Sequence, residues 1–413
     1  MRKLIFVTAQ YPYGSGETFI ENEINYLSKA FDEVYTYAVK VNASLNLSIR
    51  SVPENVRVFM SDYKEVSKKS YLKSLFNPYV IKEIACSCFL GMALKKDAEC
   101  FFFDSEVKNS SVRINEFLDS CNLSVADEIV VYSYWLSTIG MVAVRIHDKL
   151  IKRGVSAVLV SRTHRFDLYQ ERAYLNYLPF QKVMLERFDY IFPCSRQGED
   201  YLCEKYSDFS PKIHHAYLGV EDYFNGVLPK KEPEILNIVS CSNIIPVKRV
   251  GSIAMALFQI TDFSIKWTHF GDGELMDDLK AEIAKLPENI TVELPGRVPN
   301  SDIYKYYKDH NINLFINVST SEGLPVSIME AISFGIPIIA TDVGGTSEIV
   351  FDGVNGRLLP EIFEINELAD RIHEIISMSD ADYNTLSRNA RKIYEDKFNA
   401  EKNYTEFCKE LLK

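Results

Sequence analysis

Two glutamates with seven residues between them, Glu322 and Glu330, carry the clearest chemical signal in the sequence. An alternating apolar segment at 312–317 predicts a strand that is covered on both faces. Gly323 then permits a turn and Pro325 fits the first position of a helix, so Glu322 lies on a loop and Glu330 one or two turns inside the helix. Such a loop, at the carboxyl edge of a parallel sheet, is where α/β proteins usually bind ligands.

A second segment supports a ligand site at this edge. The strand predicted at 336–340 ends in another glycine-bearing loop at 341–345, and both loops lead into helices whose first N–H groups can bind an anion. The two loops therefore indicate one crevice. A simpler explanation has Glu322 capping the helix and Glu330 on a solvated face, and for the two glutamates taken in isolation it is the favoured one.

The wider segment favours the ligand site, because it resembles the E-x7-E signature of retaining glycosyltransferases of the GT-B type, family 4. The match comprises SEGLPVSIMEAISFGIPIIATDVGGTSEIV at 321–350 and DGVNGRLL at 352–359, and the resemblance is most specific over 235–359. It implies that Glu322 contacts the donor sugar during catalysis and that Glu330 accepts hydrogen bonds from the ribose. It also implies that the start of this helix binds the nucleotide-sugar through Gly323, Leu324, Pro325 and Val326.

The order of the predicted elements agrees with that resemblance. Strands and helices alternate regularly, which favours an α/β protein with two doubly wound Rossmann-like domains, and in the GT-B fold these face a central crevice. Segment 225–233 combines Gly, Pro and charge and is the best linker. We predict an N-terminal acceptor-binding domain at 1–224 and a C-terminal nucleotide-sugar-binding domain at 234–398. The resemblance implies that the last segment, about 399–413, returns to the first domain.

Short apolar runs bounded by turn signals place the strands. The first domain is expected to have strands at 4–8, 34–39, 128–133, 155–161, 190–193 and 213–217. The second is expected to have strands at 235–240, 265–270, 291–294, 312–317 and 336–340.

The first loop of the second domain, at 241–249, supplies the cations expected in the site. It follows a predicted strand and precedes a helix, so Lys248 points its ammonium toward whatever occupies the crevice, and a diphosphate is the obvious anion. A surface lysine at a helix start is the alternative. Related glycosyltransferases often carry an arginine five residues before this lysine, where the chain has Asn243, and Arg249 is a candidate for the missing charge.

Two further loops of the second domain resemble parts of a nucleotide site. Gly271 and Gly273 flank an aspartate in a tight turn, which in the family lies beside the nucleotide, although an ordinary Asp-Gly turn would look the same. Arg297 and Val298 lie in a segment similar to the one whose backbone faces the nucleobase. The identity of the base is not legible from it.

The opening loop of the first domain carries Gly14, Gly16 and Glu17 and runs directly from the first strand into a helix. In GT-B enzymes the matching loop lies near the sugar and the acceptor hydroxyl, whereas a plain strand–helix turn would have no function. Thr18 and Glu21 have the spacing of a capping box for this helix.

His164 follows the strand predicted at 155–161 and by resemblance contacts the donor sugar, although a histidine at this position is more often structural. The flanking Arg162 and Arg165 have the reach to contact a phosphate. Ser195 is expected to cap the helix that follows it.

The composition of the chain limits which other classes of protein it can belong to. The chain has 413 residues, 47% of them hydrophobic, enough for two domains, and its net charge of −11 argues against broad nucleic-acid binding. The most apolar run, 84–94, is too short to span a membrane, and the amino terminus is not a signal peptide, so we expect a cytoplasmic protein. The eight cysteines are scattered without a C-x-x-C pair, and Cys86 and Cys88 are expected to be buried thiols, so we expect no structural metal site.

The expected chemistry needs neither a metal nor another cofactor. The only D-x-D, at 380–382, is predicted to be a solvated turn far in the chain from the crevice loops, so protein groups must meet the charge of the diphosphate. Transfer with retention can proceed through a covalent glycosyl-enzyme or a front-face attack. We favour the front-face attack, because the first-domain loops offer no carboxylate matched to a nucleophile.

The expected reaction moves a sugar from a UDP- or GDP-sugar to a glycan or polyprenyl-linked glycan, and the resemblance suggests bacterial surface polysaccharide biosynthesis. The apolar, lysine-bearing region 70–103 has the composition for peripheral contact with the inner face of the cell membrane, and equally for a core. Two alternatives stay open: a sugar-nucleotide 2-epimerase of the same fold, and a non-catalytic nucleotide-sugar-binding protein.

Overall fold

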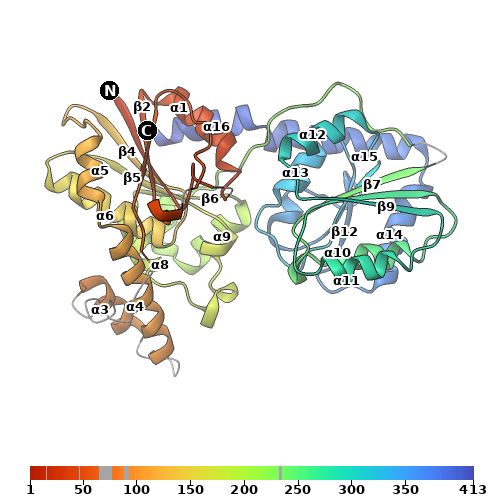
Figure 1. Cartoon of the computed structure of the whole chain (residues 1–413), viewed down its shortest axis with the longest axis horizontal. Coiled ribbons are helices and arrows are strands. Elements are labelled where there is room, and N and C mark those ends of the chain that lie inside the picture. Colours follow the sequence, from red (N-terminus) through yellow and green to blue (C-terminus); the bar gives the residue numbers. More distant parts are fainter. Residues whose placement is uncertain (15, 46, 65–76, 88–92, 232–234) are drawn as a thin grey trace. The chain divides into compact units, whose positions relative to one another are not determined.

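A computed structural model describes residues 1–14, 16–45, 47–64, 77–87, 93–231 and 235–413. The chain forms two compact units (Figure 1). The first comprises Met1–Tyr217 together with Tyr404–Lys413, and the second comprises Leu218–Asn403. Each unit is described by itself.

The first unit is built on a six-stranded parallel sheet of order β3-β2-β1-β4-β5-β6. The order reverses at the β1–β4 pair, where an open α/β sheet offers its binding crevice. Its strands are β1 (Arg2–Thr8), β2 (Glu33–Ala38), β3 (Val56–Met60), β4 (Glu128–Ser133), β5 (Val158–Thr163) and β6 (Tyr190–Pro193). The helices counted with this unit are α1 (Ile20–Ala30), α3 (Pro78–Ser87), α4 (Ala93–Ser110), α5 (Ile114–Ser120), α6 (Thr138–Lys152), α7 (Arg165–Leu168), α8 (Gln181–Arg187) and α9 (Arg196–Lys205).

The second unit repeats this architecture with the order β12-β11-β10-β7-β8-β9, and its order reverses at the β7–β10 pair. Its strands are β7 (Leu236–Cys241), β8 (Ile265–Phe270), β9 (Ile290–Gly296), β10 (Leu314–Asn317), β11 (Ile338–Thr341) and β12 (Gly356–Leu359). Its helices are α10 (Val250–Leu257), α11 (Met276–Ile283), α12 (Asn300–Asp309), α13 (Val326–Ser333), α14 (Ile365–Ser377) and α15 (Asp380–Ile393). Figure 1 shows α10, α11 and α14 on one face of this sheet and α12, α13 and α15 on the other.

The prediction of two doubly wound α/β domains is confirmed. The strand predicted at 213–217 is wrong: only an isolated bridge joins Ile213 to Ile191, because a 3₁₀ helix, Ser207–Lys212, carries the chain past the sheet edge. Two strands were missed, β3 and β12, and both lie at a sheet edge. Edge strands can be short, as β3 and β12 are with five and four residues, and a short run shows a weaker apolar pattern.

The chain passes from one unit to the other at Leu218, seven residues before the predicted linker. Val220 forms a bridge with Asn399, and the side-chain amide of Asn403 donates to the carbonyl of Leu218 at 2.9 Å. These contacts bind the crossing segment to the end of the second unit. Residues 232–234 of the predicted linker lie outside the described part of the chain.

The last helix, α16 (Ala400–Leu411), contributes to the core of the first unit. Its Phe407, Cys408 and Leu411 are buried there among side chains of β1, β4 and α1. The guanidinium of Arg162 stacks 3.9 Å from the centre of the Phe407 ring.

Arg162 is fully buried and faces Glu23, which is also fully buried, with a nitrogen–oxygen distance of 3.4 Å. Tyr132 donates to the same carboxylate at 2.8 Å, and Arg162 also donates to the carbonyl of Ala216 at 2.6 Å. The expectation that Arg162 can reach a phosphate is therefore wrong, because its charge is used inside the core of the first unit.

The Glu23→Ala variant should lose about 3–5 kcal/mol of unfolding free energy, because it leaves the Arg162 charge buried without its partner. Chemical denaturation followed by circular dichroism measures the loss. Glu186→Ala is the control, since Glu186 pairs with Lys82 on the surface and should cost no more than about 0.5 kcal/mol. Equal losses in the two variants would contradict this account of the core.

Candidate functional site

The loops after β7 and β10 bring Lys248 and Glu322 into contact. The Nζ atom of Lys248 lies 2.6 Å from Oε1 of Glu322, and the side-chain amide of Asn317 donates to the same oxygen at 3.2 Å. The Glu322 side chain is 11% exposed and that of Lys248 is 23% exposed. An ion pair therefore lies at the carboxyl ends of the two strands where the sheet order reverses, which is the expected place for a ligand.

The loop after β11 lies directly against the Glu322 loop. The amide of Gly345 donates to the carbonyl of Gly323 at 2.7 Å. Gly344 has a φ of +56°, and a Cβ atom there would lie 2.0 Å from the carbonyl oxygen of Glu322. Only glycine fits this approach, so the two loops that the sequence indicates as one crevice are adjacent.

Glu322 does not cap α13. The helix begins after Pro325, no side chain caps it, and Glu322 instead turns toward Lys248. Gly323, Leu324, Pro325 and Val326 form the connection from Glu322 into the helix.

Arg249 has a different target from the expected diphosphate. Its guanidinium donates to the carbonyls of Val318 at 2.7 Å, Ser319 at 3.3 Å and Glu361 at 2.8 Å, and it stacks 4.7 Å from the ring centre of Phe363. Arg249 thus fixes the chain just after β10, where the Glu322 loop begins. Asn243, the residue found in place of the usual arginine, is exposed on the loop after β7.

The loop after β8, with Gly271 and Gly273, packs on the loop after β7. Gly271 has a φ of +147°, and a Cβ atom there would lie 1.8 Å from the carbonyl oxygen of Ser242. At Gly273 the same atom would lie 2.3 Å from the carbonyl oxygen of Ile244. The amide of Gly271 also donates to Gly296 at the end of β9, immediately before Arg297 and Val298. Arg297 is exposed and Val298 is half-buried.

His269 supports this group of loops and was missed by sequence reasoning. It is fully buried, with Nε2 3.1 Å from the carbonyl of Ser242 and Nδ1 2.7 Å from the hydroxyl of Ser240. A carbonyl can only accept, so Nε2 carries the proton and Nδ1 accepts from Ser240. Burial lowers the pKa of His269 to about 4, and the ring is therefore neutral at pH 7.

Glu330 is buried on α13, which rules out the solvated face considered above. Its Oε1 atom accepts hydrogen bonds from the hydroxyl of Tyr304 at 2.9 Å and from the side-chain amide of Asn300 at 3.2 Å. Burial raises the pKa of Glu330 to about 7, against the opposing effect of the Tyr304 hydrogen bond. Tyr304 and Asn300 belong to α12, and no local pattern links that helix to Glu330.

In the first unit, His164 lies in an aromatic group after β5. Its ring centre is 4.5 Å from that of Trp135 and 4.8 Å from that of Tyr134. Both ring nitrogens are buried and have no hydrogen-bond partner among the described residues. Burial, with a smaller effect of Arg162, lowers the pKa of His164 to about 3, so the imidazole is neutral.

The carboxylate of Glu17 holds the opening loop of the first unit. It accepts from the backbone amides of Ala9, Gln10 and Tyr11 at 3.1, 2.6 and 2.7 Å, and from the indole of Trp135 at 2.6 Å. Glu17 therefore shapes the loop and joins it to the aromatic group around His164.

The glycines of this loop lie beside Glu17. Gly14 has a φ of +64° and donates its amide to Ser48, and the carbonyl of Gly16 accepts from Arg50.

Two capping predictions have opposite outcomes. The capping box of Thr18 and Glu21 is wrong: α1 begins at Ile20 without a side-chain cap, and Glu21 pairs with Arg50 at 2.7 Å. The cap at Ser195 is confirmed, since its hydroxyl accepts from the amide of Gly198 at 3.1 Å.

The predicted solvated turn at 380–382 is the first turn of α15 instead, because Ser379 caps the helix by accepting from the amide of Asp382. Within the described part of the chain, no helix is long and apolar enough to cross a membrane. The side chain of Cys86, the whole of Cys88, and residues 70–76 and 88–92 of the region considered for membrane contact lie outside that part.

Comparison with known proteins bears on the class of protein. Residues 224–393 match the family glycosyl transferases group 1, in agreement with the E-x7-E resemblance. The chain is 25% identical over 267 residues to the putative colanic acid biosynthesis glycosyltransferase WcaL of Escherichia coli K12, covering 63% of this chain and 64% of WcaL. It is 29% identical over 157 residues to the amylovoran biosynthesis glycosyltransferase AmsK of Erwinia amylovora, covering 36% and 39%. These matches span less than two thirds of each relative.

Solved structures show the fold over the whole chain. Sucrose-phosphate synthase from Thermosynechococcus elongatus matches with a TM-score of 0.70 and 15% identity, covering 99% of this chain and 98% of that one. HepE of Anabaena, solved in complex with UDP, matches with a TM-score of 0.66 and 18% identity, covering 100% and 99%. The predicted GT-B fold is confirmed.

The Arg249→Lys variant should destabilise the second unit by about 1–3 kcal/mol, because an ammonium cannot bond the same three carbonyls. Calorimetry should show the thermal transition lowered by about 5 °C. Arg388→Lys is the matched control, since Arg388 is exposed and donates only to the hydroxyl of Thr385. A transition that moves no further than in the control would show that Arg249 does not hold the end of β10.

Proposed function

We propose that the chain is a retaining glycosyltransferase of family 4 that moves a sugar from a UDP- or GDP-sugar to a glycan or polyprenyl-linked glycan, without a metal. The observation that carries the proposal is the Lys248–Glu322 pair at the reversal point of the second sheet, with Glu330 buried on the helix that follows. The matched relatives are named for colanic acid and amylovoran biosynthesis, which supports a role in bacterial surface polysaccharide biosynthesis.

Lys248 is proposed to bind the diphosphate of the donor. Its ammonium is partly exposed and its carboxylate partner occupies one side of it, so an arriving diphosphate can compete for the charge. The backbone amides at the start of α13, from Gly323 to Val326, add partial positive charge nearby. Together they stabilise the negative charge that develops on the leaving group. HepE, a structural neighbour, was solved with UDP-glucose.

Glu322 and Glu330 divide the recognition of the donor between them in this proposal. Glu322 contacts hydroxyls of the donor sugar, and Glu330 accepts hydrogen bonds from the ribose. Gly271, Gly273, Arg297 and Val298 approach the nucleotide through their backbone. Asn243 lies on the loop that carries Lys248 and contributes no charge.

The first unit is proposed to bind the acceptor. His164 contacts the donor sugar as a neutral imidazole, which suits hydrogen bonding to a hydroxyl but not charge stabilisation. The loop of Gly14, Gly16 and Glu17 approaches the acceptor. Attack from the leaving-group side accounts for retention, since the carboxylate of Glu17 is occupied by backbone amides and is not free to act as a nucleophile.

We propose a cytoplasmic protein that contacts the inner face of the cell membrane peripherally. Of the described residues in the region considered for this contact, Ile81 on α3 is 57% exposed and Phe102 on α4 is 41% exposed. Apolar side chains with neighbouring lysines suit an anionic membrane surface. Flotation with anionic vesicles should recover the protein in the lipid fraction, and an Ile81→Ser, Phe102→Ser double variant should stay behind. Flotation of neither protein would remove the membrane from the proposal.

Calorimetry should show one of UDP, GDP, ADP and CMP binding to the wild type, and binding should weaken by at least about tenfold in Lys248→Ala. Lys266→Ala is the matched control, because Lys266 makes a lysine–glutamate pair in the same unit, 2.8 Å from Glu293, on the neighbouring strands β8 and β9. It should bind like the wild type. No binding by any nucleotide, or equal affinity in Lys248→Ala, would overturn the donor site.

A further inference from the structure

Two side chains of α12 hold one oxygen of the buried Glu330. The hydroxyl of Tyr304 and the side-chain amide of Asn300 both donate to Oε1, at 2.9 and 3.2 Å. The other oxygen, Oε2, receives no hydrogen bond from the residues that the structure describes. The carboxylate therefore has one occupied and one available acceptor atom.

Tyr304, one of the two donors to Oε1, is itself held in place. The ring of Tyr304 packs against that of Tyr223, with 4.7 Å between ring centres, and against Phe334 at the end of α13. A hydroxyl on such a ring has little freedom to follow a moving carboxylate.

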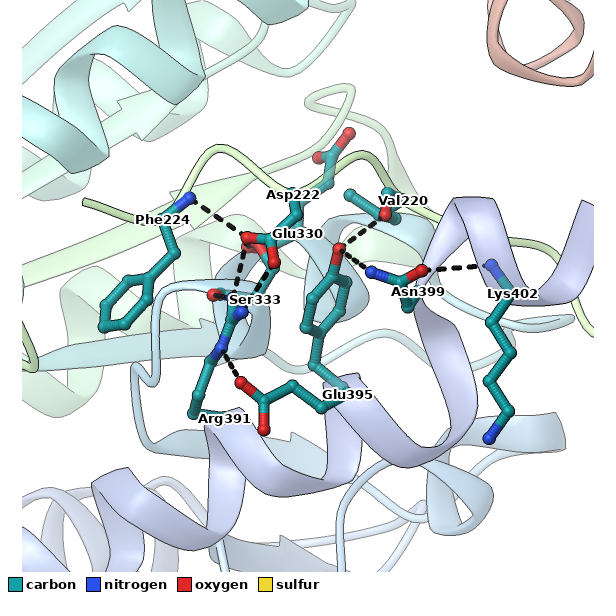
Figure 2. A network of polar contacts seen from close by, with 10 residues as sticks. Val220, Asp222, Phe224, Glu330, Ser333, Arg391, Glu395, Asn399 and Lys402 are labelled. Carbon is teal, nitrogen blue, oxygen red and sulfur yellow. Dashed lines mark hydrogen bonds and ion pairs between the residues drawn. The ribbon is translucent and has the colours of Figure 1, made fainter. Parts of the chain in front are cut away.

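The carboxyl-terminal end of α13, the helix that carries Glu330, is held by a residue of α15. The hydroxyl of Ser333 donates to the carbonyl of Glu330 at 2.7 Å, and Arg391 on α15 donates to the carbonyl of Ser333 (Figure 2). Arg391 in turn pairs with Asp222 at 2.6 Å and with Glu395 at 2.7 Å. Both the backbone and the side chain of Glu330 are thus constrained.

We propose that Tyr304 and Asn300 are positioning residues of the donor site, which orient Glu330 so that its Oε2 atom faces the ribose hydroxyls of a nucleoside diphosphate. This rests on the proposed donor site. An ionised carboxylate held in one orientation can accept hydrogen bonds from hydroxyl groups with both of its oxygens. The hydrogen bonds from Tyr304 and Asn300 hold the orientation of Glu330, and the bond from Tyr304 also favours its ionised form.

The charge of Glu330 depends on the hydrogen bond from Tyr304. Burial raises its pKa to about 7, and the bond from Tyr304 lowers it. The titratable groups that face Glu330 from neighbouring elements are Cys241 at the end of β7 and Tyr307 on α12. Burial raises the pKa of Cys241 to about 12 and that of Tyr307 well above its usual value, so both are neutral near pH 7.

The Tyr304→Phe variant should therefore bind nucleotide more weakly than the wild type, and most clearly at pH 7 and below. Without the hydroxyl the pKa of Glu330 rises, so a smaller fraction of it is ionised at pH 7 and binding is lost at a higher pH than in the wild type. We expect about tenfold weaker binding of UDP or GDP at pH 7, and at pH 9 a smaller loss that remains because the hydroxyl no longer holds the orientation of the carboxylate. Calorimetry between pH 5.5 and 9 measures this profile. Asn300→Ala should shift the profile in the same direction by less, because its hydrogen bond is longer.

Tyr307→Phe is the matched control. Tyr307 lies three residues further along α12, is buried, and has a hydroxyl without a hydrogen-bond partner among the described residues. Loss of this hydroxyl should leave the pH dependence of nucleotide binding unchanged. A shift equal to that of Tyr304→Phe would reduce the effect to packing and overturn the proposal.

A second measurement does not depend on the ligand. In protein labelled with ¹³C at the glutamate carboxyls, the resonance of Glu330, assigned with Glu330→Gln, should titrate at a higher pH in Tyr304→Phe than in the wild type. An unchanged titration together with unchanged nucleotide binding would overturn the role of Tyr304 while leaving the donor site intact. Absence of nucleotide binding in the wild type at every pH would instead overturn the donor site, and this role with it.

Discussion

The second unit depends on how closely its strand-end loops approach one another. Gly271 lies against the carbonyl of Ser242 and Gly344 against the carbonyl of Glu322, at distances that leave no room for a Cβ atom. These approaches bring the loops after β7, β8, β10 and β11 into one group at the carboxyl edge of the sheet. Lys248 and Glu322 can form a 2.6 Å pair only because the backbone beneath them is packed in this way.

Arg249 and His269 lie among these loops, but neither offers a positive charge to a ligand. Arg249 gives its guanidinium to three backbone carbonyls, and His269 is neutral, so neither competes for an anionic ligand. Lys248 is partly exposed and pairs with Glu322, a contact that the proposed diphosphate would displace. Glu330 adds a carboxylate whose burial makes its ionisation sensitive to the hydrogen bond from Tyr304. This arrangement suits the ligand proposed above, which brings both a diphosphate and hydroxyl groups.

The fold and the separate positions of Lys248 and Glu322 at one sheet edge could be predicted because their signals are local, whereas the contact between the two side chains was not predicted. Alternating apolar runs gave most of the strands, and Lys248 and Glu322 each follow a strand that ends at the reversal point. The target of Arg249, the burial of Arg162 beside Glu23, and the contacts of Tyr304 and Asn300 with Glu330 could not be predicted, because each joins segments more than twenty residues apart. The edge strands β3 and β12 were missed because they are short, so that their apolar pattern is weak.

A crystal structure of the chain with bound UDP or GDP would test the proposed donor site. We expect a diphosphate oxygen within hydrogen-bond distance of Nζ of Lys248, an opened contact between Lys248 and Glu322, and ribose hydroxyls that face Glu330. A nucleotide bound elsewhere, with the Lys248–Glu322 pair intact, would contradict it.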